Sequence, residues 1–317
     1  EDQLDEGKDF ENRSVSHPYE PGSVAKVVTA AAALQEGVTT PDEVHQVPGS
    51  IDMAGVTVND AWEHGTEPYT TTGIFGKSSN VGTLMIADKL GQEKYAEYLK
   101  KFGLGNTTGV ELPNESAGSV PDLEQWSGGT FANLPIGQGQ SWTTLQMASV
   151  YQALANGGER IAPRIIDSVK GPDGKDEKLE EPEKNQVVSP ETAKTTVDMF
   201  RAVFQDDEAG VQNGTADNAQ LKGYQLSGKT GTAQKVDPNT GSYSNSAYWI
   251  TFAGIAPAND PRFVVAVMLD EPKSGVEDNG GGGQSAAPIF RDIASWLLNR
   301  DNIPTSKPAP RLTLRAQ

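Results

Sequence analysis

The order of predicted elements indicates an α+β protein, with helices in the middle of the chain and a sheet in its C-terminal third. The 317 residues suit one large domain or two ordinary ones. Helical runs ended by turn residues occupy 71–102 and 143–155. Three β-rich runs follow at 223–236, 247–255 and 263–269, each bounded by turn residues. We therefore expect a helical subdomain beside a sheet.

Composition excludes several classes of function. The chain has no cysteine, which rules out disulfides, thiol catalysis and thiolate zinc sites. A formal net charge of −17 repels nucleic acid and anionic membrane surfaces, and we interpret it as serving solubility. The longest apolar run, near 27–34, is shorter than the roughly 18 residues that span a bilayer. No signal peptide starts at Glu1, so we expect a soluble protein or a fragment without its anchor.

The first predicted helix follows a Pro-Gly break and extends from Ser23 to about Gln35. Its residues are mostly Ala and Val on every side, which is typical of a buried helix. Gly37 is a plausible stop for it. Residues 38–70 carry scattered Pro, Gly and Thr and are expected to form loops with short strands.

Two helices are predicted at Thr71–Leu90 and Glu93–Phe102, separated by Gly91, and a long irregular connection at 105–141. The other expected elements are a helix at 143–155, a strand or two at 161–169, a solvated loop at 172–184, a helix from Ser189-Pro190 to about 204, a flexible glycine loop at 279–283, an amphipathic helix at 288–298 and a loosely attached Pro-rich tail after 302.

Three short motifs carry the chemistry. The chain reads SxxK at Ser23–Lys26, SxN at Ser78–Asn80 and K-T-G at Lys229–Gly231, and each motif occurs once and in this order. One SxxK match is expected by chance in a chain this long, whereas the ordered set of three is rare. The set is similar to the signature of serine enzymes that attack penicillins and D-alanyl peptides.

Ser23 is the candidate nucleophile and Lys26 its base. On a helix a spacing of three places both side chains on one face. A serine hydroxyl is a weak nucleophile until a base takes its proton, and lysine is a base only if its pKa falls toward neutrality. Burial in the apolar helix and a second cation, for which Lys229 is the candidate, both lower that pKa. The start of a helix also favours negative charge developing at Ser23.

The SxN motif lies at an expected break between helical segments. The Ser78 hydroxyl can relay a proton to a leaving amine, and the Asn80 amide can hold a peptide group through its donor and acceptor. Both residues would also suit a helix cap, which is the structural alternative. Lys77 is expected to be a surface charge.

The K-T-G motif is expected to bind a carboxylate through Lys229 and Thr230. Gly231 removes a side chain where another backbone approaches. The backbone N–H groups of Thr232 and Ser23 can together form an oxyanion hole. The structural alternative is a strand with a bulge.

No cofactor or metal is expected. His17, His45 and His64 show no metal-ligand spacing, and structural or surface roles are predicted for them. The glycine loop at 279–283 lacks both phosphate-binding patterns and is interpreted as a linker.

The chain resembles the transpeptidase domain of class B penicillin-binding proteins, and within them the septal cell-division enzyme of actinobacteria. The resemblance extends from Asn12 to Arg300 and is carried by these segments: N-R-S-V-S-H-P-Y-E-P-G-S-V-A-K, N-D-A-W-E-H-G, K-S-S-N-V-G-T, F-G-L-G, L-P-N-E-S-A-G, N-L-P-I-G-Q-G-Q, S-G-K-T-G-T-A-Q and Y-W-I-T-F-A-G-I-A-P. It implies the penicillin-recognising fold shared with serine β-lactamases, a mainly antiparallel sheet flanked by helices beside an all-helical subdomain.

The resemblance also implies a function. The protein would be an extracytoplasmic D,D-transpeptidase that crosslinks peptidoglycan stem peptides and is acylated by β-lactams. Ser23 would be acylated, Lys26 would be its base and Ser78 would relay protons. Asn80 would hold the substrate amide, and the K-T-G segment with Thr232 would bind the terminal carboxylate and complete the oxyanion hole. Division membrane proteins would bind through regions absent here.

Domain boundaries follow from the same resemblance. We expect a partial N-terminal segment at 1–22, a transpeptidase domain at 23–300 with the helical subdomain roughly at 38–155, and the Pro-rich tail at 301–317. Family members carry a membrane anchor, a pedestal domain and one or two sheet strands ahead of the nucleophile. Only 22 residues precede Ser23 here, so an excised catalytic domain is expected.

Three alternatives stay open. A serine β-lactamase of class A needs a water-activating Glu in an ExxxN pattern, and the best-placed residue, Glu115, is followed four positions on by Ser119 rather than Asn. A D,D-carboxypeptidase differs only in using water as acceptor. A penicillin sensor or a division scaffold would need no turnover, although the complete motif set argues against a decayed site.

Overall fold

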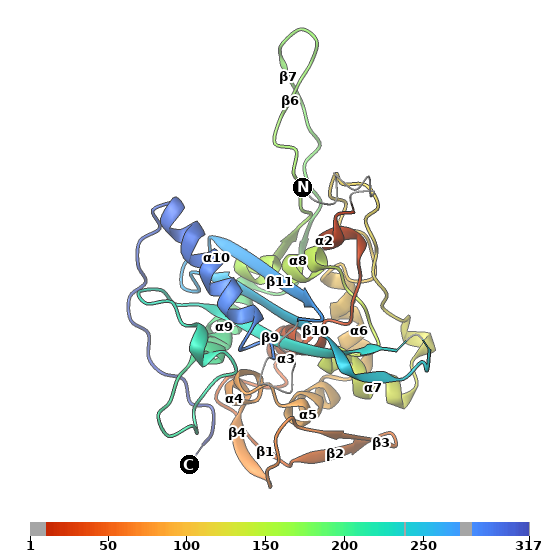
Figure 1. Ribbon diagram of the computed structural model, residues 1–317, viewed down its shortest axis with the longest axis vertical. Helices are drawn as coiled ribbons and strands as arrows, with labels where there is room; N and C mark the ends of the chain where they lie inside the picture. The colour runs from red at the N-terminus through yellow and green to blue at the C-terminus, as the bar shows by residue number, and fades with distance from the viewer. Residues whose placement is uncertain (1–10, 238, 273–280, 317) are drawn as a thin grey trace.

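The structure is a computed structural model that describes residues 11–237, 239–272 and 281–316. It has the predicted α+β architecture, in which a sheet and its covering helices stand above a mainly helical region (Figure 1). Within the described ranges, no helix combines the length and apolar character that a membrane crossing requires.

Three long antiparallel strands form the central sheet. β9 (Ser227–Val236), β10 (Tyr243–Ala256) and β11 (Phe263–Asp270) lie in the order β11-β10-β9. Both α8 (Thr144–Ala155) and α10 (Ala286–Arg300) pack against β10 and β11. Figure 1 shows α10 in front of the sheet and α8 behind it. The strand runs predicted from the sequence are therefore confirmed, and each strand ends within a few residues of its predicted bounds.

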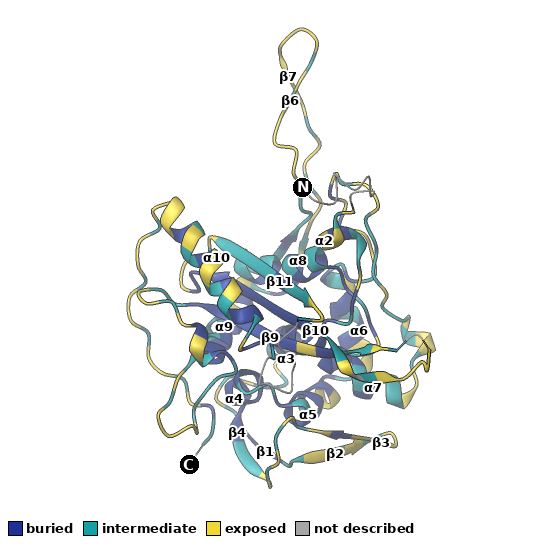
Figure 2. Cartoon of the chain, in the orientation of Figure 1, coloured by how far each residue is buried: buried dark blue, intermediate teal, exposed yellow. Residues whose placement is uncertain are grey.

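The helical region is built around α3 (Lys26–Gln35), whose first eight residues are all buried. α5 (Asn80–Leu90), α6 (Gln92–Lys101) and α9 (Pro190–Met199) pack around it. The apolar surface that α3 presents on every side explains this position, because such a helix must be covered all round. Figure 2 shows α3 and much of β9 and β10 as buried, whereas β11 is mostly intermediate.

The predicted first helix divides into two parts. Gly22–Ala25 forms a 3₁₀ turn, and the α-helix begins only at Lys26. The predicted helix at 71–90 also divides, into α4 (Thr71–Gly76) and α5, so that the SxN motif lies in the break between them. The predicted break at the motif is thus confirmed.

Smaller elements complete the described chain. The short strands pair as β1 (Val44–Val47) with β4 (Glu67–Thr70), β2 (Ser50–Met53) with β3 (Val56–Asn59), β5 (Glu159–Ile161) with β8 (Lys184–Gln186), and β6 (Val169–Lys170) with β7 (Asp176–Glu177). The short helices and 3₁₀ turns are α2 (Arg13–Ser16), α7 (Gly128–Asn133), Leu123–Gln125, Leu134–Ile136, Phe200–Phe204 and Asp217–Ala219.

The predicted solvated loop at 172–184 is the tip and one arm of the β6–β7 hairpin. It projects away from the body, and most of its residues are exposed (Figure 2). The predicted irregular connection at 105–141 contains α7, which Ser127 caps, and two 3₁₀ turns, of which the first follows Asp122 and the second has Pro135 near its start.

The prediction of a loosely attached tail was wrong. The Leu314 side chain is fully buried, and its carbonyl oxygen accepts a hydrogen bond from the Thr70 backbone N–H at 3.0 Å. A β-carbon at Gly73 would lie 1.8 Å from that same oxygen, so the tail occupies the space that this glycine leaves on α4.

Candidate active site

The three motifs meet in one groove between the sheet and the helical region. The groove has a volume of about 380 Å³. Its lining residues are Gly22, Ser23, Ala61, Trp62, Lys77, Ser78, Asn80, Ile136, Gln138, Thr215, Thr230, Gly231, Thr232, Gly282 and Gly283. Segments separated by more than 200 residues in the sequence therefore contribute to a single site, as the motif order predicts.

Ser23 lies in the 3₁₀ turn at the start of α3 and is half-buried. Gly22 before it has φ +60°, a conformation that favours glycine. A β-carbon at Gly22 would lie 3.0 Å from the Thr232 carbonyl oxygen, so this turn presses directly against β9. The expected α-helical spacing of Ser23 and Lys26 is therefore replaced by a tighter turn, in which the Lys26 N–H donates to the Ser23 carbonyl.

The Lys26 side chain is fully buried and is held by the SxN turn. Its Nζ donates to the Ser78 carbonyl at 2.7 Å, to Asn80 Oδ1 at 2.7 Å and to Ser78 Oγ at 3.3 Å. Burial lowers the pKa of Lys26 to about 7, and the negative charge of Asp60 opposes that shift. A lysine with this pKa can exchange a proton near neutral pH, as a general base must.

Ser78 adopts φ +64°, a left-handed conformation that is uncommon for a residue other than glycine. This conformation turns both its carbonyl and its hydroxyl toward Lys26. Backbone strain of this kind persists only where the surroundings enforce it, and it concentrates at functional sites.

Asp60 is the residue that enforces the turn. Its Oδ1 accepts from the backbone N–H groups of Asn80 at 2.5 Å and Val81 at 3.0 Å, and its Oδ2 accepts from Ser79 Oγ at 2.7 Å. Oδ2 also lies 3.0 Å from His64 Nε2. The side chain of Asp60 is fully buried. Sequence reasoning did not single out Asp60, and the only signal was its place in the segment N-D-A-W-E-H-G.

The K-T-G strand supplies a second buried lysine. Lys229 is fully buried, and its Nζ donates to the Thr230 carbonyl at 3.1 Å and to Thr230 Oγ1 at 3.3 Å. Burial, and then the charge of Lys26, hold the pKa of Lys229 well below its usual value. Burial is thus the largest cause of the lowered pKa at both lysines, and the second charge acting on Lys26 is that of Asp60 rather than that of Lys229, which the sequence had suggested. Thr230 Oγ1 lies 2.8 Å from Thr215 Oγ1, which fixes the hydroxyl at the groove.

Gly231 stands where two other segments approach, as expected. A β-carbon there would lie 2.1 Å from Thr251 Oγ1 and 2.9 Å from the Pro21 carbonyl oxygen. The hydroxyl of Thr232, one residue on, accepts from the Gly282 backbone N–H at 3.4 Å. The strand and the nucleophile turn are thus in direct contact, and Ser23 and Thr232 both line the groove.

Two expectations about flanking segments need correction. Lys77 is half-buried and lines the groove, and burial lowers its pKa, so it is not a simple surface charge. Gly282 and Gly283 also line the groove, so this part of the glycine loop is more than a linker. Asn279 and Gly280, which complete the predicted loop, lie outside the described residues.

Glu115, the candidate water-activating residue of a β-lactamase, does not line the groove. Its carboxylate accepts from the Thr108 N–H at 2.7 Å, from Thr108 Oγ1 at 2.5 Å and from the Gly109 N–H at 3.1 Å. Glu115 therefore closes a loop elsewhere in the molecule.

The three histidines make local contacts. His17 packs edge-on against Trp249, His45 Nε2 lies 2.9 Å from Thr71 Oγ1, and His64 stacks on Trp62 at 5.1 Å. In the described part of the chain, no three His, Asp or Glu side chains gather as a metal site would require.

The arrangement supports acyl transfer. The candidate nucleophile Ser23 and Thr230 both line the groove. Lys26, whose pKa burial lowers to about 7, bonds to Ser78 and Asn80 of the same groove, and Lys229 Nζ contacts Thr230 Oγ1. The backbone N–H groups of the nucleophile turn and of β9 border the groove, where they can stabilise an oxyanion.

Comparison with known proteins agrees with this geometry. The family model described as the penicillin binding protein transpeptidase domain matches residues 1–295. The chain is 60% identical over 306 residues to penicillin-binding protein PbpB of Mycolicibacterium smegmatis, covering 96% of this chain and 47% of that protein. It is 33% identical over 294 residues to peptidoglycan D,D-transpeptidase FtsI of Escherichia coli K12, covering 92% of this chain and 46% of that protein.

A solved structure is similarly close. Penicillin binding protein 3 from Mycobacterium tuberculosis, complexed with aztreonam, matches with a TM-score of 0.94 and 55% identity, covering 100% of this chain and 70% of that one. The fold implied by the motifs is therefore confirmed. The chain spans about half the length of the curated relatives it matches.

Proposed function

Because this chain belongs to the family of penicillin-binding protein transpeptidase domains, we propose that it is the catalytic part of a peptidoglycan D,D-transpeptidase with Ser23 as nucleophile. The observation that carries the proposal is the buried Lys26, which has a pKa of about 7 and is bonded to the SxN turn at the Ser23 groove. Such a lysine serves no stabilising purpose that an apolar residue would not serve better.

The first half-reaction is acylation. Ser23 Oγ attacks the carbonyl carbon of the penultimate D-alanine, and neutral Lys26 accepts the hydroxyl proton. The N–H groups of Ser23 and Thr232 hold the oxyanion of the tetrahedral intermediate. When the C–N bond breaks, Ser78 Oγ passes its proton to the departing D-alanine nitrogen and takes up the proton that Lys26 Nζ, 3.3 Å away, received from Ser23, which leaves the lysine neutral again.

The second half-reaction is aminolysis. An amine of a neighbouring stem peptide loses a proton to the same base and attacks the Ser23 ester, which restores the free hydroxyl. Asn80 Nδ2 already donates to the Asn59 carbonyl at 3.0 Å and its Oδ1 accepts from Lys26, so its amide is held in a fixed orientation toward the groove.

The K-T-G strand binds the terminal carboxylate of the substrate. The Thr230 hydroxyl lines this end of the groove and contacts Lys229 Nζ, and together they supply hydrogen-bond donors for a carboxylate. β-Lactams carry a carboxylate at the matching place and would follow the first half-reaction only. The M. tuberculosis relatives complexed with aztreonam and with ampicillin support this part of the proposal.

The cellular setting is proposed from the relatives. The chain's likeness to PbpB and FtsI supports an extracytoplasmic role in wall synthesis at division, in a longer protein with a membrane anchor and division-protein partners.

The test is acylation by a fluorescent penicillin, followed by intact mass for the protein and its Ser23→Ala variant. We expect a one-to-one adduct that persists for hours and is absent from Ser23→Ala. An adduct that disappears while antibiotic is consumed would indicate a β-lactamase instead. Incubation with a D-Ala-D-Ala peptide and an acceptor amine then separates a transpeptidase from a carboxypeptidase, which would release D-alanine without forming the amide product.

A further inference from the structure

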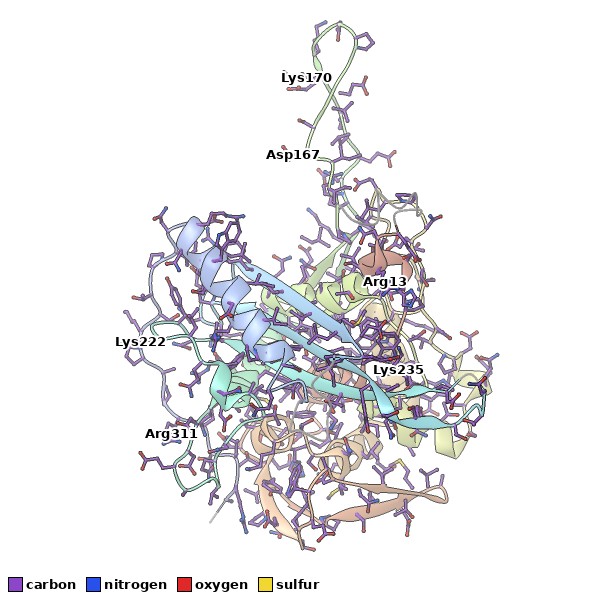
Figure 3. The ribbon with its side chains drawn as sticks, in the orientation of Figure 1. Arg13, Asp167, Lys170, Lys222, Lys235 and Arg311 are labelled. Carbon is purple, nitrogen blue, oxygen red and sulfur yellow. The ribbon has the colours of Figure 1, made fainter. Side chains whose placement is uncertain are left out.

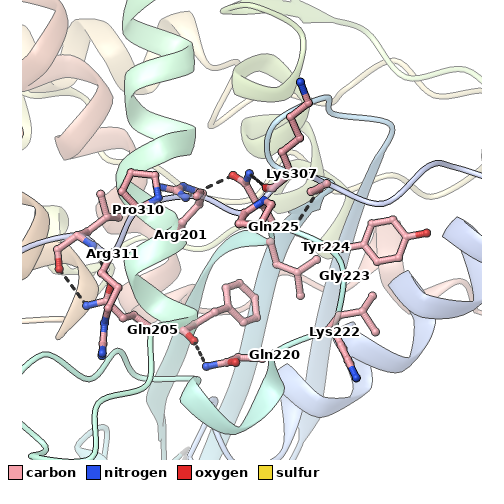
Figure 4. A pocket seen from close by; sticks show the side chains of 17 residues that line it. Arg201, Gln205, Gln220, Lys222, Gly223, Tyr224, Gln225, Lys307, Pro310 and Arg311 are labelled. Atoms are coloured by element: carbon pink, nitrogen blue, oxygen red, sulfur yellow. Dashed lines mark hydrogen bonds between the residues drawn. The ribbon is translucent and has the colours of Figure 1, made fainter.

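A second cavity lies between the C-terminal tail and the segment that leads into β9. It has a volume of about 650 Å³, larger than that of the active-site groove and in the range of ligand pockets. Its roof is the tail segment 306–312, and its floor combines the 3₁₀ turn Phe200–Phe204 with residues 220–226 (Figure 4). None of the proposed catalytic residues lines it.

The charge of this pocket is opposite to that of the chain. Arg201, Lys222, Lys307 and Arg311 line it, and no carboxylate from the described part of the chain does, although Arg311 pairs with Asp207 outside the lining at 3.4 Å. The chain as a whole carries a formal charge of −17. The Lys222 and Lys307 amines extend outward on opposite sides of the pocket (Figure 4), where they can attract an anion to its mouth.

Arg201 is the anchor inside the pocket. Its side chain is only 13% exposed, yet the nearest carboxylate, that of Asp198, is 3.9 Å away. Its Nε donates to the Asp198 carbonyl at 3.3 Å and one terminal nitrogen donates to Gln225 Oε1 at 3.3 Å. A guanidinium has five N–H donors, so most of this one's capacity is open to a planar anion.

The roof offers backbone groups to an extended chain. Glutamines fix both of its ends: Gln225 Nε2 donates to the Lys307 carbonyl at 2.7 Å, and Gln205 exchanges two bonds with Leu312, at 2.8 and 2.9 Å. Among the described residues, the backbone of Pro308–Arg311 between these clamps makes no hydrogen bond, which leaves the N–H groups of Ala309 and Arg311 and the carbonyls of the segment, because Pro308 and Pro310 have no N–H. An extended peptide can therefore pair with this segment while its carboxylate reaches Arg201.

We propose that this pocket binds a short acidic peptide segment, with a carboxylate on Arg201 and the peptide backbone along Pro308–Arg311. Phe204, Leu221 and Leu226 in the lining accept the apolar part of such a segment. The site goes beyond the proposed transpeptidase function, and its occupancy does not require an active Ser23.

Two capped dipeptide amides test the proposal, acetyl-Ala-Glu-amide and its uncharged isostere acetyl-Ala-Gln-amide, with inorganic phosphate as a third probe. Titrations followed by isothermal calorimetry or NMR at low salt should show saturable binding of the Glu peptide. The Gln peptide should bind about tenfold more weakly or worse, the difference expected for one lost charge-assisted bond. Higher salt should weaken the Glu peptide.

The variants locate the site. Arg201→Gln should reduce Glu-peptide affinity about tenfold. Lys307→Gln, which changes an exposed side chain and should leave the fold intact, should reduce it by a smaller factor. Lys170→Gln is the matched control, because Lys170 lies on the projecting hairpin far from Lys222 and Arg311 (Figure 3). Ser23→Ala should bind as the unmodified protein does.

Three results would overturn the proposal. Equal affinity for the Glu and Gln peptides would show that the carboxylate does not contribute to binding. Phosphate binding as tightly as the Glu peptide would show a simple anion site with no peptide recognition. Glu-peptide binding that survives both Arg201→Gln and Lys307→Gln would place the ligand elsewhere.

Discussion

The pH dependence of acylation depends on Lys26. A lysine of ordinary pKa, about 10.4, is neutral in roughly one molecule in 2,500 at pH 7. A pKa of about 7 makes half of the molecules neutral at that pH, so burial raises the population of competent base about a thousandfold. We expect the second-order rate of acylation by penicillin to fall about tenfold per pH unit below 7 and to level off above about 8.

Replacing Asp60 by Asn tests the cause of that pKa. The Asp60 charge raises the pKa of Lys26 against the effect of burial, so Asp60→Asn should lower the pKa and shift the acid limb of the profile to lower pH. The Asn side chain keeps an oxygen to accept from the Asn80 and Val81 N–H groups, so the turn should persist. Stopped-flow fluorescence from pH 5 to 9 measures the shift.

A control separates Lys26 from Lys229. Lys229→Arg carries a charge at every accessible pH, so any limb that remains in its profile belongs to another group. A profile without a limb near pH 7 in the unmodified protein, or a shift to higher pH in Asp60→Asn, would refute the assignment of Lys26 as the base.

Further predictions concern stability and recognition. Lys26→Met should be more stable than the unmodified protein at pH 6 and lose part of that advantage by pH 9. The depressed folded pKa of Lys26 costs the unmodified protein stability in full below about pH 7, and this cost declines as the pH rises toward about 10, where the unfolded lysine also loses its proton. Urea denaturation at both pH values measures the difference, and a pH-independent gap would contradict it. Leu314→Ala should cost about 2–5 kcal/mol of unfolding free energy because it leaves a cavity at a fully buried site. Thr313→Ala, at the exposed neighbouring position, should change the unfolding free energy little and serves as the comparison. Thr230→Val should slow acylation by carboxylate-bearing penicillins with little change in melting temperature, because it deletes a hydroxyl facing the groove. An unchanged acylation rate would show that Thr230 does not bind the carboxylate.

The sequence identifies the reacting groups better than their supports. Ser23, Lys26, Ser78, Asn80 and the K-T-G strand are recognisable because each motif is a local pattern whose spacing is set by one turn or strand, and the structure brings all of them to one site. The 3₁₀ geometry at Ser23 was missed because its cause, the contact of Gly22 with Thr232, joins residues far apart in the sequence.

The residues that hold the reacting groups in place could not be predicted from the sequence for the same reason. Asp60 is an ordinary acidic residue in a loop-like segment until the fold places it under the N–H groups of Asn80 and Val81. Lys77 follows a helix end and resembles any exposed lysine, yet neighbouring segments cover it. A Pro-rich tail reads as unstructured because its attachment depends on Gly73 and Thr70, whose partners no local pattern reveals.

The attachment of Leu314 to Thr70 also sets an order of events during biosynthesis. Thr70 precedes its partner by 244 positions, and α4, which it caps, leads into the SxN turn. Ser23 and Ser78 are synthesised long before the segment that braces this turn. A nascent chain released before residue 314 would therefore contain every reacting group but lack the segment that packs on α4, the helix that leads into Ser78. Maturation of the site must then be a late event in folding.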